Sequence, residues 1–375
     1  MKGPSPSHGA AAGWRMIRFS KEPAKAGTGV EQIDVPFRLD PPERAPGQPV
    51  RWYRVPIPKE ELRRLNQRSD LLGAMQTLGF LGTIGGTGTL FVWSCFHAPW
   101  LAPLAILAHG ACCAFLVNGF HELVHDSVFR TRWLNRAFLP VFSFLGWYNH
   151  VGFWASHTEH HKFTLHPPDD LEVVQPEQVS WRRLARMALF DALGFVHTVR
   201  GTWRTARGFL QGDWERHLFE RVKPEMRPAF HRWARVVLVG HALVVAASVA
   251  SGWWPVAIAV TTCRFFAPVL QFLTNATQHI GLMDRYPDYR VCCRTIELNP
   301  VLRFLYWHMN YHTEHHMYPG VPCYNLAKLH RLVRHELPPT SRGLLRTWAS
   351  IRPILRRQAS EPDYRHVPPL PERSR

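Results

Sequence analysis

The sequence predicts an integral membrane protein in which four membrane-spanning helices form two hairpins. Two long segments nearly free of charged residues, 71–121 and 236–283, predict the four spans. Lysine and arginine gather in the segments outside them and are absent from the turn at the centre of each. The pentapeptide HTEHH occurs twice, each time in a charged segment and with unrelated flanking residues. A repeated motif without a repeated domain indicates that one chemical requirement is met twice.

The first uncharged segment is long enough to cross a bilayer twice. Residues 71–121 contain no Asp, Glu, Lys or Arg, and the short turn-like sequence SCFHAPW divides them. A span needs about 20 residues at about 1.5 Å per residue. We therefore expect spans at about residues 72–94 and 99–120.

The second uncharged segment divides at SGWWP, where Gly and Pro favour a turn and the two Trp residues favour the membrane interface. It predicts spans at about residues 233–251 and 254–273. Arg264 is the one charge within it. Either Arg264 faces protein or water, or the fourth span is shorter than these limits.

The distribution of cations predicts the orientation in the membrane. All Lys and Arg residues except Arg264 lie before residue 72, in 129–235 or after 284, which places them on one side of two hairpins. The positive-inside rule makes that side cytoplasmic, with both termini there. The same rule explains a net charge of +17 without nucleic acid as a partner, and no nucleic-acid-binding motif accompanies that charge.

The ends of the chain differ in composition from its centre. We expect a disordered basic cytosolic arm over residues 1–50, a membrane domain over 51–345 and a basic cytosolic tail over 346–375, disordered from 352. The seven cysteines include the adjacent pairs Cys112–Cys113 and Cys292–Cys293 but no CxxC motif. This pattern is neither a disulfide framework nor a zinc ribbon, so we expect reduced, structural thiols.

Several histidines are spaced so that their rings share one face of a helix. HELVH places two of them four residues apart, and each HTEHH places three at positions i, i+3 and i+4. Asn275 and His279 have the same four-residue spacing at the cytoplasmic end of the second hairpin. The candidate ligands are His121, His125, His157, His160, His161, His279, His312, His315 and His316.

Nine imidazoles exceed what a single metal ion takes, because a structural zinc binds four ligands. They suit two adjacent ions, and imidazole fits iron, zinc or copper. For the histidines near the motifs we expect packing or support of the ligands; these are His150, His166, His308 and His330. For Asp169, Asp170 and Glu172 we expect a solvated loop, with orientation of ligand histidines as the alternative.

The segments HELVHDSVF, SHTEHHKFT and NYHTEHHMYPGVP resemble the three histidine boxes of the membrane fatty acid desaturase and hydroxylase superfamily. The resemblance covers about residues 70–335. It implies an all-α membrane protein with four spans and a cytosolic helical cap that carries the boxes. It also implies that the nine histidines bind two non-haem iron ions, with His279 as the ligand after the fourth span and Asn275 in contact through water. The sequence identifies no catalytic group beyond the metal centre.

The resemblance further implies oxidation of an unactivated C–H bond of a lipid acyl chain by O₂, with introduction of a double bond. Electrons would come from a separate ferredoxin or cytochrome-type donor and its reductase, because the chain has no ferredoxin pattern and no dinucleotide fingerprint. One alternative is a hydroxylase or ketolase acting on a lipid, alkane or carotenoid. A remoter one is a metal transporter, although a transporter would place its histidines within the spans.

Overall fold

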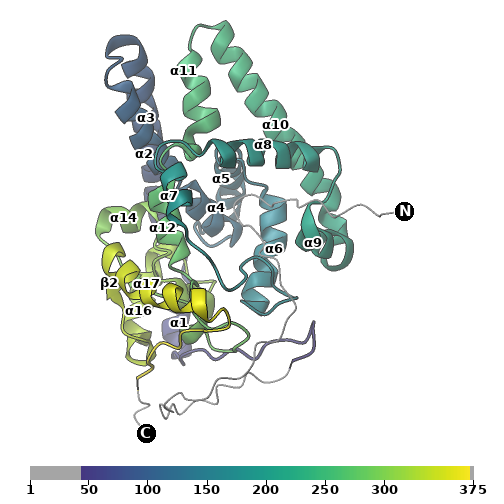
Figure 1. Cartoon of the computed structure of the whole chain (residues 1–375), viewed down its shortest axis with the longest axis vertical. Coiled ribbons are helices and arrows are strands. Elements are labelled where there is room, and N and C mark those ends of the chain that lie inside the picture. The colour runs from purple at the N-terminus through teal and green to yellow at the C-terminus, as the bar shows by residue number, and fades with distance from the viewer. Residues whose placement is uncertain (1–43, 372–375) are drawn as a thin grey trace.

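The computed structural model describes residues 44–371, and nearly all of their regular structure is helical. Two pairs of helices project from one end of the molecule, and the remaining elements gather at the other end (Figure 1). The first pair is α2 (Asp70–His97) followed by α3 (Ala102–Cys113) and α4 (Leu116–Val124). The second is α10 (Arg227–Ala250) with α11 (Trp254–Ala257).

Three helices of the described residues are long and apolar enough to cross a membrane. They are Asp70–His97, Ala102–Val124 and Pro224–Ala250, which correspond to the first three predicted spans. Their outward side chains include large apolar residues that are well exposed, such as Leu71, Leu104 and Leu243. Apolar surface of this kind suits contact with lipid. The protein is therefore a membrane protein, and the first predicted hairpin is present as expected.

The segment predicted as the fourth span is not one continuous helix. After α11 it passes through the π-helix η3 (Ile258–Thr262) and the 3-10 helix η4 (Cys263–Phe265), and helix resumes at α12 (Val269–Ala276). Pro268 explains the break, because proline lacks the amide N–H and disfavours a helical residue before it. Accordingly, Ala267 has a φ of 44°.

Arg264 lies at this break and faces protein. Its guanidinium donates to Thr198 Oγ1 at 3.1 Å and lies over the rings of Tyr148 and Phe265. Thr198 belongs to α8 (Ala192–Ala206), which crosses below α10 and α11 (Figure 1). The first of the two alternatives for Arg264, contact with protein or water, is therefore confirmed.

The remaining elements gather at the end of the molecule opposite the tips of the two helix pairs, and we call this part the cap (Figure 1). Those before α10 are α1 (Lys59–Leu65), α5 (Arg132–Leu145), α6 (His150–Phe163), α7 (Trp181–Met187), α9 (Gly212–Arg216), η1 (His217–Val222) and η2 (Pro224–Met226). Those after α12 are α13 (Tyr289–Cys292), β1 (Ile296–Glu297), α14 (Pro300–Leu305), α15 (His312–Met317), η5 (Cys323–Asn325), α16 (Leu326–Val333), η6 (Arg334–Glu336), β2 (Ser341–Arg342) and α17 (Leu344–Ser360). The largest hydrophobic cluster joins α4 to this cap and includes the fully buried Trp307 and Phe120.

The C-terminal segment is ordered, so the prediction of a disordered tail from residue 352 is wrong for 352–371. Helix α17 buries Ile351 and Ile354, and Trp348 Nε1 donates to Leu273 O at 3.0 Å. Beyond the helix, His366 N donates to Gly281 O at 2.9 Å. The buried apolar side chains of α17 explain the order, which its basic composition conceals.

The predicted N-terminal arm lies largely outside the described residues. Of its 50 residues the structure describes only 44–50, and these pack against the cap rather than extending from it. Arg44 pairs with Asp169, and Gly47 N donates to the same carboxylate at 2.9 Å. The prediction of disorder is therefore wrong for this short stretch.

Candidate metal centre

Three helices bring the histidine motifs together below the long helices. The second box lies on α6, which begins where Asn149 Oδ1 accepts from Gly152 N at 3.1 Å. The third box lies on α15, and the first box ends α4, with His121 in its last turn and His125 as its C-cap. All three boxes are helical or helix-terminal, as the i, i+4 spacing of HELVH and the i, i+3 and i+4 spacing of the two HTEHH copies predict.

All nine predicted histidines meet in two adjacent groups. The first group has five rings with ligand atoms within 4.8 Å of one another: His121, His125, His157, His161 and His315. The second contains His160, His279 and His316 by the same criterion. His312 joins it, because His312 Nε2 lies 2.9 Å from His279 Nε2 and 3.0 Å from His316 Nε2. The rings of His161 and His316 connect the groups, with centroids 4.5 Å apart.

Within each group the Nε2 atoms point at one another. His157 Nε2 lies 3.2 Å from His125 Nε2 and 2.9 Å from His161 Nε2. Two nitrogens bound to one metal at about 2.1 Å, at right angles, would be about 3.0 Å apart. The observed spacing therefore fits ligands that share an ion.

The Nδ1 atoms of several of these rings face acceptors outside the groups. His157 Nδ1 lies 2.8 Å from Glu172 Oε1, and His160 Nδ1 lies 2.8 Å from Asp170 Oδ2. His279 Nδ1 lies 2.9 Å from the carbonyl oxygen of Cys292. An acceptor at Nδ1 holds the proton there and leaves the lone pair on Nε2, which is how outer partners orient metal-binding histidines.

The loop after the second box is therefore not a solvated loop. Asp170 is fully buried, and its carboxylate also accepts from Leu165 N at 2.7 Å and Glu172 N at 2.9 Å. Burial raises the pKa of Glu172 to about 7. The alternative role for Asp170 and Glu172, orientation of histidines, matches these contacts, and the preference for solvent was wrong. Asp169 differs, because it binds Arg44 and Gly47 N instead of a histidine.

Burial lowers the pKa of most of these imidazoles and keeps them neutral; for His125 and His279 it lowers the pKa to about 3, and the charge of a neighbouring histidine adds to the effect. His160 is the exception, because the negative charge of Asp170 outweighs burial and raises its pKa. Several nitrogens of the nine rings are buried without a hydrogen-bond partner in the described residues, among them His121 Nε2, His312 Nδ1 and both nitrogens of His315. Neutral, unpartnered and converging nitrogens are a donor set that fits metal ions.

His279 reaches the second group from a turn. Helix α12 ends at Ala276, so the prediction that Asn275 and His279 lie on one continuing helix is wrong. The turn is fixed from outside, because Gln175 Nε2 donates to His279 O at 2.7 Å and Arg294 donates to the carbonyls of Thr277 and Ile280. Asn275 Oδ1 lies 3.5 Å from Asn118 Nδ2, beside α4.

Gln175 and Arg294 could not be predicted from a motif, because both act through backbone carbonyls and neither lies in a histidine box. Of the four nearby histidines, three make contacts of the packing or supporting kind, while His308 Nδ1 is buried without a hydrogen-bond partner in the described residues. His330 Nδ1 contacts Glu314 of the third box, and His166 Nδ1 lies 2.8 Å from Thr164 O. His150 Nδ1 lies 3.4 Å from Ser143 Oγ.

The fold and the histidine groups together define a membrane protein built around two groups of histidines that could hold metal ions. A comparison with protein families matches the fatty acid desaturase family over residues 98–348, about two thirds of the chain. The protein belongs to the fatty acid desaturase family, which makes an oxidoreductase its expected class. A search of curated proteins gave no match.

Proposed function

We propose that the protein introduces a double bond into the acyl chain of a membrane lipid, using O₂ and two histidine-bound iron ions. The observation that carries this proposal is the convergence of nine imidazoles, seven of them buried and two half-buried, in two touching groups. When bound, the iron ions supply activation of O₂, a chemistry that no side chain provides. The family match supports the class of reaction and the lipid substrate.

The two groups divide the ligands between the two ions. The first group offers five histidines and the second offers four, including His279 and His312. Glu172 and Asp170 hold two of the rings by their Nδ1 atoms. Asn275 would contact the centre through water. Burial of seven of the nine rings limits the access of bulk water, which protects a reactive centre from side reactions.

The broken segment would serve as a fourth span, which places both termini and the centre on the cytoplasmic side. The cationic residues outside the spans support this orientation and would attract an acidic electron donor, a ferredoxin or cytochrome-type protein served by its reductase. Labelling of single cysteines in sealed vesicles tests the orientation. A cysteine placed at Trp253 should react from outside and one at Thr158, on α6, only after the membrane is opened. Equal access to both positions would exclude it.

Product analysis tests the reaction itself. The full chain is expressed in a host of defined lipid composition, and its lipids are compared by mass spectrometry with those of two variants. His157→Ala should lose the product and the iron, while His335→Ala, at an exposed histidine outside both groups, should keep both. A new double bond supports the proposal. A hydroxylated or keto product would assign the alternative chemistry, and metal flux without a lipid product would overturn both.

A further inference from the structure

A second cluster of metal-ligating side chains lies inside the membrane-spanning region. His109 and Cys113 are four residues apart on α3, and Cys263 comes from η4 in the broken segment. A ring nitrogen of His109 and both sulfurs lie within 4.8 Å of one another, and all three residues are buried. His109 precedes His121 by roughly 18 Å of helix at about 1.5 Å per residue, so this cluster is separate from the histidine groups.

The hydrogen bonds of His109 fix its tautomer. Nε2 lies 2.9 Å from the carbonyl oxygen of Ala259, which can only accept, so Nε2 carries the proton. Nδ1 therefore presents a lone pair. Thr87 Oγ1 lies 2.9 Å from Nδ1 and can donate to this lone pair; an ion bound to Nδ1 would replace this donor, and the hydroxyl would then donate to Thr83 O at 2.8 Å. A ring N–H held by a backbone carbonyl is the usual arrangement of a metal-binding histidine.

The sulfurs lie close enough to the His109 ring for all three side chains to reach one ion. Cys113 Sγ lies 3.7 Å from His109 Nδ1 and 3.5 Å from Nε2, so it lies alongside the ring, and binding to an ion on Nδ1 requires a small turn of the Cys113 side chain. A nitrogen at about 2.1 Å and a sulfur at about 2.3 Å from a tetrahedral ion are about 3.6 Å apart. Gly110 makes the arrangement possible, because a Cβ there would lie 2.3 Å from Phe266 Cβ and 2.8 Å from Cys263 O. Any larger residue would push the broken segment, and Cys263 with it, away from α3.

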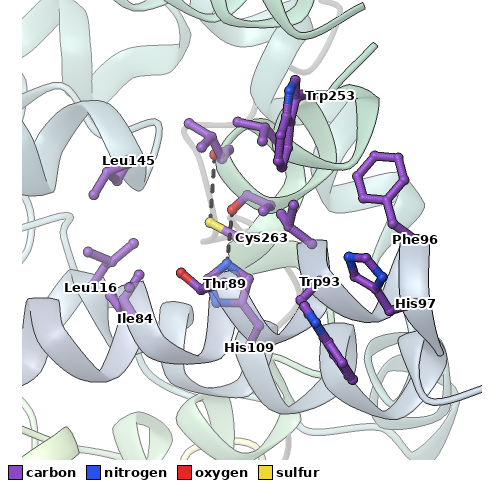
Figure 2. Close-up of a pocket in the computed structure, with 16 residues that line it drawn as sticks. Ile84, Thr89, Trp93, Phe96, His97, His109, Leu116, Leu145, Trp253 and Cys263 are labelled. Carbon is purple, nitrogen blue, oxygen red and sulfur yellow. Dashed lines mark hydrogen bonds between the residues drawn. The ribbon is translucent and has the colours of Figure 1, made fainter. Parts of the chain in front are cut away.

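One side of the cluster opens into a cavity of about 520 Å³ between the two pairs of helices. Figure 2 shows Cys263 and His109 facing one another there, with Trp93, Phe96 and Trp253 around the outer end. The other lining residues are almost entirely apolar. His109 and Cys263 line this cavity and Cys113 lies behind them, so the open side of the cluster leaves room for a fourth ligand.

We propose that His109, Cys113 and Cys263 form a zinc site whose fourth position faces this cavity. Two thiolates, one imidazole and one water are a ligand set that Zn²⁺ takes in tetrahedral geometry. On binding, two S–H bonds break, two Zn–S bonds form and two protons leave, with no change of oxidation state. Two protons leave and one Zn²⁺ binds, so the site stays neutral overall. An apolar environment favours a neutral site, because burying a net charge is costly.

The site would fasten the broken segment to α3. Backbone outside regular helix is tolerated at membrane depth only where it is buried in protein or lines a cavity. Cys263 stands at the start of this irregular stretch, three residues before the extended Phe266. A bond from zinc to Cys263 would therefore hold the break in place independently of the iron centre.

Metal analysis of the purified full-length protein tests the proposal. After growth with both metals, the protein should contain one zinc per chain in addition to its iron. Replacing the zinc by Co²⁺ should give thiolate-to-cobalt charge-transfer absorption. Cys263→Ser and Cys113→Ser should each lose this absorption and most of the zinc but retain the iron. Cys112→Ser, at the adjacent half-buried thiol of α3, should lose neither.

A second measurement uses the unaltered protein and so does not depend on the folding of a variant. Alkylation followed by mass spectrometry should find Cys113 and Cys263 protected until a chelator removes the zinc, and reactive afterwards. Zinc that disappears in His315→Ala would belong to the histidine groups and would overturn the proposal. Copper in place of zinc, a disulfide between the two cysteines, or cobalt binding without thiolate absorption would overturn it as well.

Discussion

Replacement of Asp170 by Asn should weaken iron binding without removing a ligand. The carboxylate holds His160 through Nδ1 at 2.8 Å and is itself fixed by two backbone amides. In Asp170→Asn one oxygen becomes an NH₂ group that faces either the ring N–H or a backbone N–H. The anionic partner of His160 is lost, and one contact becomes repulsive because both groups are donors.

The expected magnitude follows from the behaviour of such outer partners. Loss of one partner lowers metal affinity about 10–100-fold, which corresponds to about 1.4–2.8 kcal/mol. The assay equilibrates the protein with a series of competing chelators and measures the iron retained per chain. The midpoint of that series should move by one to two decades for the variant, roughly in proportion to the affinity.

Asp169→Asn is the matched control. Asp169 is the adjacent residue and also buried, but its carboxylate binds Arg44 and Gly47 N and touches no histidine. This variant should retain iron like the unaltered protein. If both variants retain iron equally across the chelator series, the role assigned to Asp170 is refuted. The unfolding temperature of each metal-free variant is also measured. A value equal to that of the unaltered protein means that the variant is folded and that only its metal site is weaker.

Three further predictions test other parts of the structure. Arg294→Gln should lower the iron content, because the turn that carries His279 loses two hydrogen bonds. Arg285→Gln, at an exposed position, should not lower it, and equal iron contents in the two variants would contradict the prediction. Removal of residues 344–375 should lower the unfolding temperature by roughly 5 °C or more, since α17 buries apolar side chains, and an unchanged value would mean that the tail packs weakly. The metal-free protein should lose stability as pH falls from about 6.5 toward about 3. In this range the unfolded chain binds protons at His125 and His279, whereas the folded chain does not, because their folded-state pKa is about 3. An unfolding temperature that does not change with pH would refute this.

Hydropathy and charge were sufficient to predict the first hairpin, because a helix exposed to lipid needs apolar, uncharged side chains along its whole length. They were insufficient at the fourth segment. There Pro268 and Ala267 interrupt a stretch whose composition is that of a span, and contacts with α3 and α8 compensate for the break. The order of α17 was missed for a related reason. Its apolar face is narrow, and the basic residues around it dominate the average composition.

The nine histidines were found from spacing and family resemblance, because imidazoles that meet at a metal must come from fixed positions on helices. The supporting residues were harder to predict. Asp170 and Glu172 lie in a loop whose sequence, after Pro167 and Pro168, is typical of solvent. Only the return of the chain beneath α6 brings them to His160 and His157. The signal that points to them is sequence distance, because each carboxylate follows its histidine within 15 residues.

The break in the fourth segment also bears on how the protein is made. A segment with Arg264 near its centre enters a bilayer poorly by itself, at a cost of about 2.5–3.5 kcal/mol for the arginine. The groups that receive the guanidinium, the ring of Tyr148 and the hydroxyl of Thr198, are translated before it. Gly110 packs against Phe266 and Cys263, which are also translated after it, so this contact forms only when the last segment has been made. If this segment spans the bilayer as we propose, it would enter by docking onto helices already in place, and its insertion would be a step of tertiary folding.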